Sequence, residues 1–98
     1  MSKPRVVKDY DKLDESVKQL IKLTYPEGFE RNLIQFKNKE GKTVSALPFE
    51  TEEVYYLIRM TILEAQEIIE EDEDYDDEGF LKDEVREEYE ENIEDDED

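Results

Sequence analysis

The carboxylates between residues 74 and 85 come closest to a recognisable chemistry. Three acids, a glycine and a branched apolar residue occupy positions 1, 3, 5, 6 and 8 of a calcium-binding loop: Asp74, Asp76, Glu78, Gly79 and Leu81. Alternate carboxylates can converge on one ion, and the glycine permits the sharp turn. Position 12 is Val85 instead of a bidentate glutamate, and Glu84 is one residue short.

Two interpretations of this segment stay open. The first is a weak divalent-cation (Ca²⁺) site whose ligands are Asp74, Asp76, Glu78 and Glu84. The second, which the density of acids favours, is an acidic linker that matches the spacing by chance. Beyond this weak Ca²⁺ site, the sequence predicts no cofactor.

A second candidate site is a group of cations around a predicted hairpin: Arg31, Lys37, Lys39 and Lys42. Together with the nearby Phe36 they form a patch that could contact a partner or the phosphates of RNA or DNA. The simpler interpretation, which we favour, is a solvated hairpin tip whose lysines discourage edge-to-edge pairing of strands.

The chain lacks the side chains on which most catalytic sites depend. It contains no Cys and no His. Cys-ligated zinc, haem held by His or Cys, cysteine nucleophiles and Ser-His-Asp triads are therefore excluded. Ser16 and Ser45 have no imidazole to activate them. We therefore expect a protein that is not an enzyme.

Charge divides the 98 residues into two unequal parts. Residues 1–48 hold ten Lys/Arg and seven acids, whereas residues 49–98 hold three Lys/Arg and 24 acids, and the formal net charge is −18. A segment so acidic and so poor in apolar residues buries too little surface to offset its ordering entropy. The sequence predicts a small domain over 1–71 and an acidic tail over 72–98.

Hydrophobic spacing predicts the elements of that domain. Apolar residues at helical spacing predict a helix that ends near Thr24, because Pro26 disfavours helical geometry before it. The runs 31–37 and 43–47, separated by Asn38 to Gly41, predict a hairpin. Residues 54–60 fit a strand or a helix, and their β-branched and aromatic content favours the strand. A capping box at Thr61 and Glu64 predicts a helix from Ile62 to about Glu71.

These elements predict an α+β fold in the order helix, three strands, helix. The strands are expected to form a three-stranded antiparallel meander. The acidic tail that follows is expected to be largely disordered or transiently helical. A narrow stripe along the tail is compatible with a helix that forms on binding: Leu81, Val85, Tyr89 and Ile93.

Several stretches of the chain resemble a group of small acidic proteins of Bacteroidetes-type bacteria. The resemblance lies in residues 6–13, 25–29, 36–38 with Gly41, and 51–59. It covers about residues 5–60. The group has no established activity, so the resemblance implies no substrate or site residue. It does support the strand interpretation of 54–60.

Together these observations predict an interaction or regulatory module. The acidic tail would engage a basic partner or screen the lysines of its own domain. The alternatives are a weak nucleic-acid binder inhibited by its own tail and the weak cation site at 74–85. The net charge opposes nucleic-acid binding by the full chain. The N-terminal residues lack the apolar stretch of a signal peptide and no apolar run could span a membrane, so we expect a cytoplasmic protein of bacterial type.

Overall fold

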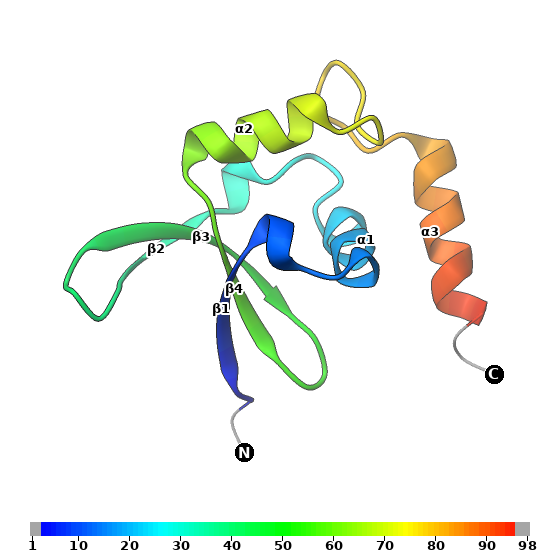
Figure 1. Ribbon diagram of the computed structural model, residues 1–98. Coiled ribbons are helices and arrows are strands. Elements are labelled where there is room, and N and C mark those ends of the chain that lie inside the picture. The colour runs from blue at the N-terminus through cyan, green and yellow to red at the C-terminus, as the bar shows by residue number, and fades with distance from the viewer. Residues whose placement is uncertain (1–2, 96–98) are drawn as a thin grey trace.

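A four-stranded sheet forms one layer of the structure and helices form the other (Figure 1). The computed structural model describes residues 3–95, with side chains as far as Asn92. In chain order the elements are β1 Arg5–Asp9, the 3-10 turn η1 Tyr10–Lys12, α1 Glu15–Thr24, the 3-10 turn η2 Glu30–Asn32, β2 Ile34–Lys37, β3 Thr43–Glu50, β4 Tyr55–Arg59, α2 Ile62–Glu71 and α3 Asp83–Asp95.

The sheet has the strand order β1-β4-β3-β2 and is mixed. Strands β2, β3 and β4 pair antiparallel in chain order, and β1 pairs parallel with β4, with Val7 in register with Leu57. The prediction of a three-stranded antiparallel meander is therefore wrong. Strand β1 escaped prediction because it has only two adjacent valines between charged residues. Its partner also lies some 50 residues further along the chain, so no turn signal links the two.

The helices of the domain follow their local signals. Helix α1 begins after Asp14 and ends at Thr24, next to Pro26, which confirms the predicted end. At the start of α2 the Thr61 hydroxyl accepts a hydrogen bond from the Glu64 N–H at 3.0 Å, and the Glu64 carboxylate accepts one from the Thr61 N–H at 2.9 Å. This reciprocal pair satisfies two N–H groups at the helix start and confirms the predicted capping box.

Residues 55–59 form a strand, which settles the ambiguity between strand and helix in this stretch. Strand β3 continues through Pro48 because β2 pairs only as far as Ala46. The backbone groups of alternate residues of β3 face β2, and those of Pro48 face the region beyond the end of β2. No strand of the described residues lies there to accept a hydrogen bond, so the lack of an N–H group in proline costs no ladder hydrogen bond. The Pro48 carbonyl on the same side accepts a hydrogen bond from the Tyr25 hydroxyl.

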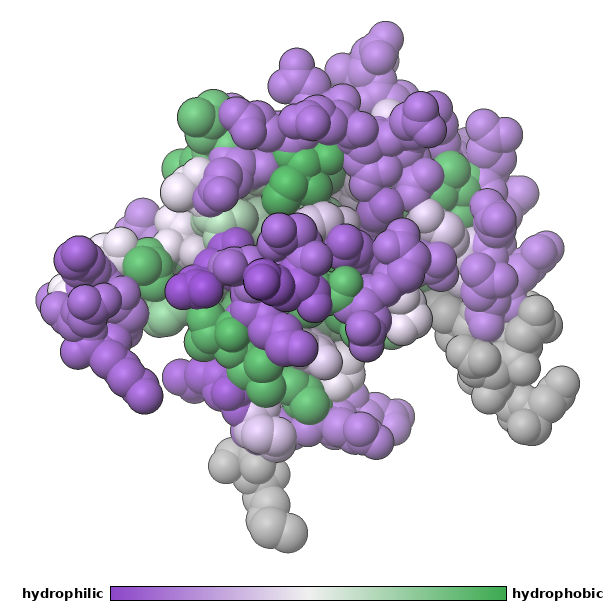
Figure 2. Space-filling view, in the orientation of Figure 1, coloured by the Kyte–Doolittle hydropathy of each residue, from purple (hydrophilic) through white to green (hydrophobic). Residues whose placement is uncertain are grey.

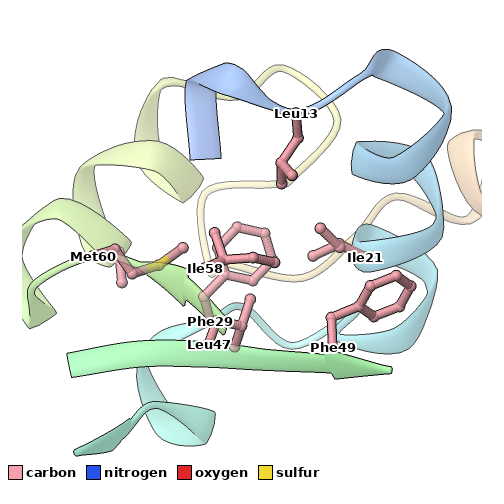
Figure 3. Packing of buried hydrophobic residues seen from close by; sticks show 8 residues of the cluster. Leu13, Ile21, Phe29, Leu47, Phe49, Ile58 and Met60 are labelled. Carbon is pink, nitrogen blue, oxygen red and sulfur yellow. The ribbon is translucent and has the colours of Figure 1, made fainter. Parts of the chain in front are cut away.

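The hydrophobic core lies between the sheet and the helices (Figure 3). Its fully buried members come from α1, from the loop before η2, and from strands β3 and β4: Ile21, Phe29, Leu47 and Ile58. Helix α2 contributes Ala65, which is also fully buried. Every second residue of β3 and β4 therefore points at the helices, as one face of a pleated sheet must.

The acidic segment packs against the domain as far as the structure describes it, whereas the sequence predicted a tail that is largely disordered or transiently helical. Tyr75 and Leu81 are 5% and 6% exposed, and α3 packs against α1. The argument from composition failed because it counted only the number of apolar residues in the segment. Two apolar side chains are enough to anchor the segment when they can be buried against the existing core. Residues 96–98 of that predicted tail lie outside the described residues.

Candidate functional site: an acidic surface anchored by Lys22

A buried lysine joins the first helix to the acidic segment. Lys22 lies in the last turn of α1, and its side chain is only 8% exposed. Its Nζ atom lies 2.7 Å from an oxygen of Asp72 and 2.8 Å from an oxygen of Asp74. The two carboxylates are themselves largely withdrawn from water. Such a cation is tolerable inside a protein because two anions compensate it.

Tyr89 completes this group, which we name the Lys22 cluster: Lys22, Asp72, Asp74 and Tyr89. The Tyr89 hydroxyl, from the second turn of α3, donates a short hydrogen bond to Asp74. The Lys22 Nζ atom also lies 5.9 Å from the centre of the Tyr89 ring. Helix α1 is thus tied at one point to the 72–82 connection and to α3, which follow it by about 50 residues or more.

The protonation states of the cluster follow from its geometry. Burial alone would raise the pKa of Asp74, but hydrogen bonds from Lys22 and Tyr89 outweigh burial and lower it. Burial alone would lower the pKa of Lys22, but its bonds to Asp72 and Asp74 raise it instead. Burial and the bond to Asp74 raise the pKa of Tyr89. At neutral pH Lys22 is therefore charged, Asp74 is ionised and Tyr89 is neutral.

A second set of contacts fixes the connection beside the cluster. The Tyr75 hydroxyl donates to the Tyr25 carbonyl at 3.0 Å, and its ring meets Phe29 edge-on with centroids 6.1 Å apart. The Leu81 N–H donates to the Pro26 carbonyl at 2.7 Å. Both buried residues of the segment are thus held by a backbone group of the loop that follows α1.

Helix α2 and the anchored segment that follows it carry a dense set of exposed carboxylates, which we name the acidic surface. It consists of Glu64, Glu67, Glu70, Glu71, Glu73, Asp76, Asp77, Glu78, Asp83, Glu84, Glu87, Glu88, Glu90 and Glu91. Lys82 and Arg86 are the cations within this stretch. Figure 2 shows hydrophilic side chains over most of α2 and α3. Among the described residues, none of these carboxylates forms an ion pair.

The four predicted cation ligands do not converge. Asp74 belongs to the Lys22 cluster, and Glu84 lies in the first turn of α3. Asp76 accepts hydrogen bonds from the N–H groups of Glu78 and Phe80, both at 2.9 Å, which shapes the turn around Gly79. Within residues 3–92, no three acidic side chains are arranged as a metal-binding group.

The four predicted patch cations lie near one edge of the sheet. Lys37 ends the edge strand β2, Lys39 and Lys42 lie in the hairpin loop, and Arg31 lies in η2 just before the strand. All four are exposed, and in the described part of the chain none is paired with a carboxylate. The hairpin loop, which turns at Gly41, projects away from the helices (Figure 1).

A groove beside α2 is a further feature of the surface. Acidic residues from the end of β1, from η1 and from α2 line it: Asp9, Asp11, Glu64, Glu67 and Glu71. Tyr10 also lines this groove, and its buried hydroxyl has no hydrogen-bond partner among the described residues. Burial raises the pKa of Tyr10 to about 12, so this tyrosine is neutral at physiological pH. Arg59 also lines the groove and pairs with Asp9.

Sequence reasoning missed the Lys22 cluster entirely. Lys22 lies beside the apolar stripe of α1, where a lysine is ordinarily solvated. Its partners lie 50 and 52 positions further on, among many other acids. The one local hint is the tyrosine and leucine placed among these acids, Tyr75 and Leu81, because apolar residues in so polar a run need a place to be buried.

No helix among residues 3–95 has the length and apolar character needed to cross a bilayer. Comparison with known protein families, curated proteins and solved structures finds no match for this chain.

Proposed function

We propose that the protein is a non-enzymatic interaction module whose acidic surface binds a basic partner. The observation that carries this proposal is the exposed, unpaired state of the carboxylates on a segment that the Lys22 cluster ties to the core. Carboxylates on an anchored scaffold attract a cationic surface over a long range and lose little conformational entropy when it docks.

The anchoring also bears on which lysine the acidic segment neutralises. It neutralises Lys22, which is buried, and forms no ion pair with Arg31, Lys37, Lys39 or Lys42 within the described residues. Most of its charge therefore remains available to another molecule. This supports engagement of an external basic partner over screening of the domain's own lysines.

The test uses a fluorescent octalysine peptide as the basic probe and the full-length protein. A variant with Glu87, Glu88, Glu90 and Glu91 changed to Gln removes four charges from α3. A matched control removes four exposed charges elsewhere, with Glu27, Glu40, Glu52 and Glu53 changed to Gln. Anisotropy titrations should show about tenfold weaker binding for the α3 variant and less than about threefold for the control, with steep weakening at high salt. Equal losses in both variants would contradict the proposal, because total charge alone would then govern binding.

The exposed, unpaired patch cations support a second candidate, nucleic-acid binding through the β2 edge. The same titration with a single-stranded oligonucleotide tests it. Binding that appears in the α3 variant but not in the native chain, and that disappears when Lys37, Lys39 and Lys42 are changed to Gln, would favour an autoinhibited nucleic-acid binder. Truncation at residue 71 is unsuitable, because it removes the buried Tyr75 and Leu81.

A further inference from the structure

The face of the sheet that points away from the helices is apolar. Core residues alternate along β3 and β4, so their neighbours point to the opposite face. The strand register extends this face across all four strands, because Leu57 is level with both Val7 and Pro48, and Ala46 is opposite Ile34. We name this the outer sheet face, and its apolar members are Val7, Ile34, Phe36, Val44, Ala46, Pro48, Tyr55 and Leu57.

None of these eight residues belongs to the core cluster or to the side chains packed against it. Ala46 and Leu57, at the centre of the sheet, are buried, whereas Val7 and Ile34, on its two edge strands, are 44% and 40% exposed. Helices α1 and α2 both lie on the other side of the strands (Figures 1 and 3), and hydrophobic side chains reach the surface over β1 (Figure 2).

The charges on the outer sheet face nearly cancel. Its ionic members are Arg5, Asp9, Glu50 and Arg59, and Lys3 joins them through its ion pair with Glu50. Arg59 lies 3.0 Å from Asp9, Glu50 lies 2.6 Å from the amine of Lys3, and the Arg5 guanidinium lies over the Tyr55 ring at 5.9 Å. Three cations against two anions thus leave this face almost neutral on a chain whose net charge is −18. The centre of the outer sheet face has no unpaired charge to which a strongly charged partner would bind.

The proportions of the molecule are those of two layers. Its smallest extent is 19 Å, against 42 and 36 Å in the other directions. A sheet and one helix layer account for about 20 Å, so no third layer covers the sheet. The 22 strand residues, at about 3.3 Å along a strand and about 4.8 Å between strands, give the outer sheet face a flat area of about 350 Å². This is less than half of the roughly 800 Å² that each partner buries in a stable interface, so the face suits a weak and reversible contact.

We propose that the outer sheet face binds a second copy of this chain, so that two sheets pack face to face in a symmetric dimer. A second copy supplies what the face requires, which is an apolar surface with almost no net charge. The arrangement also keeps the two acidic surfaces apart, because each lies on the helix side of its own sheet. At a separation of about 30 Å, well beyond the Debye length of about 8 Å, their repulsion is screened. The small area predicts a weak and reversible dimer.

Sedimentation velocity between 1 and 500 µM tests the dimer. Val7→Lys and Ile34→Lys each place a charge on the outer sheet face. Ile62→Lys and Leu63→Lys are matched controls, since these residues are 53% and 64% exposed but belong to α2. The native protein should pass from monomer to dimer over this range. The two sheet variants should raise the dissociation constant at least about tenfold, whereas the α2 variants should change it less than about twofold.

A second measurement keeps the proposal testable if a variant fails to fold. Dilution of the native protein should shift amide resonances of β1 and β2 and leave those of α3 unchanged. A native chain that stays monomeric at 500 µM would overturn the proposal, as would a dimer that the α2 variants dissociate while the sheet variants do not. Neither result bears on the octalysine assay, which reports on the opposite side of the molecule.

Discussion

Lys22 is the residue on which the position of the acidic segment most depends. The substitution Lys22→Met removes the charge of the side chain and keeps most of its volume. Asp72 and Asp74 are then close together without a cation between them. The loss of one partner from a buried pair costs about 3–5 kcal/mol. Because these carboxylates keep 18% and 25% exposure, we expect a loss of about 2–3 kcal/mol in the free energy of unfolding, measured by urea denaturation.

Lys12→Met is the matched control for this change, because Lys12 is exposed and lies in η1, outside the cluster. It should alter the free energy of unfolding by less than about 0.5 kcal/mol. If Lys22→Met changed stability as little as Lys12→Met, the Lys22 cluster would not be the anchor that its geometry indicates.

Asp74 gives the cluster a pH dependence with a defined sign. Its pKa in the folded state lies below the ordinary 3.8, so its stabilising effect is present above pH 3.8 and is lost as pH falls through the folded value. Asp74→Asn should therefore cost about 1 kcal/mol at pH 7, and the difference from the native protein should shrink toward zero below pH 3.8.

Urea denaturation at several pH values measures this difference. The exposed neighbour Asp77 serves as the control, because Asp77→Asn should have little effect at either end of the range. A difference between native and Asp74→Asn proteins that persisted unchanged at pH 3 would contradict the assigned hydrogen bonds.

At the scale of elements, the connection 72–82 and helix α3 depend on two buried side chains. Leu81→Ala should lower the free energy of unfolding by about 2–4 kcal/mol, because the side chain leaves a cavity beside the core. Its neighbour Phe80 is 45% exposed, so Phe80→Ala should cost less than about 1 kcal/mol. Urea denaturation of the two variants separates a packed connection from a solvated tail, in which neither substitution would matter.

The predictable elements were those whose causes are local. The end of α1 at Pro26, the hairpin turn at Gly41 and the capping box of α2 each depend on residues within a few positions of one another, and sequence spacing located all three. Strand β1 and the ordering of 72–92 depend on partners about 50 positions away. A single sequence offers no pattern that pairs Val7 with Leu57, or Lys22 with Asp74.

The candidate sites divide in the same way. The exposed positions of the four patch cations followed from a locally predicted hairpin. The proposed cation ligands matched a spacing rule, but Asp74 is drawn to Lys22 and Asp76 to neighbouring backbone N–H groups. The spacing of acids along the chain does not indicate that a lysine will bind one of these carboxylates, because that lysine belongs to another element.

At the scale of the whole molecule, the net charge of −18 opposes the compact state while the buried contacts hold it. Salt screens repulsion among exposed carboxylates far more than it screens the enclosed Lys22 cluster. The free energy of unfolding should therefore rise by about 1–2 kcal/mol between 20 and 300 mM NaCl. Urea, which adds no ions, is the denaturant that allows this measurement.

The variant with Glu87, Glu88, Glu90 and Glu91 changed to Gln shows where that repulsion resides. Like charges three and four residues apart on a helix each cost about 0.2–0.5 kcal/mol, and acids near the end of α3 also oppose the helix dipole. We expect this variant to be about 1 kcal/mol more stable than the native protein at 20 mM NaCl and to respond less to added salt. The control with Glu27, Glu40, Glu52 and Glu53 changed to Gln removes the same charge and should keep most of the response. Two results would contradict this location of the repulsion. One is an equal loss of the salt dependence of stability in both variants, and the other is a native protein that salt destabilises.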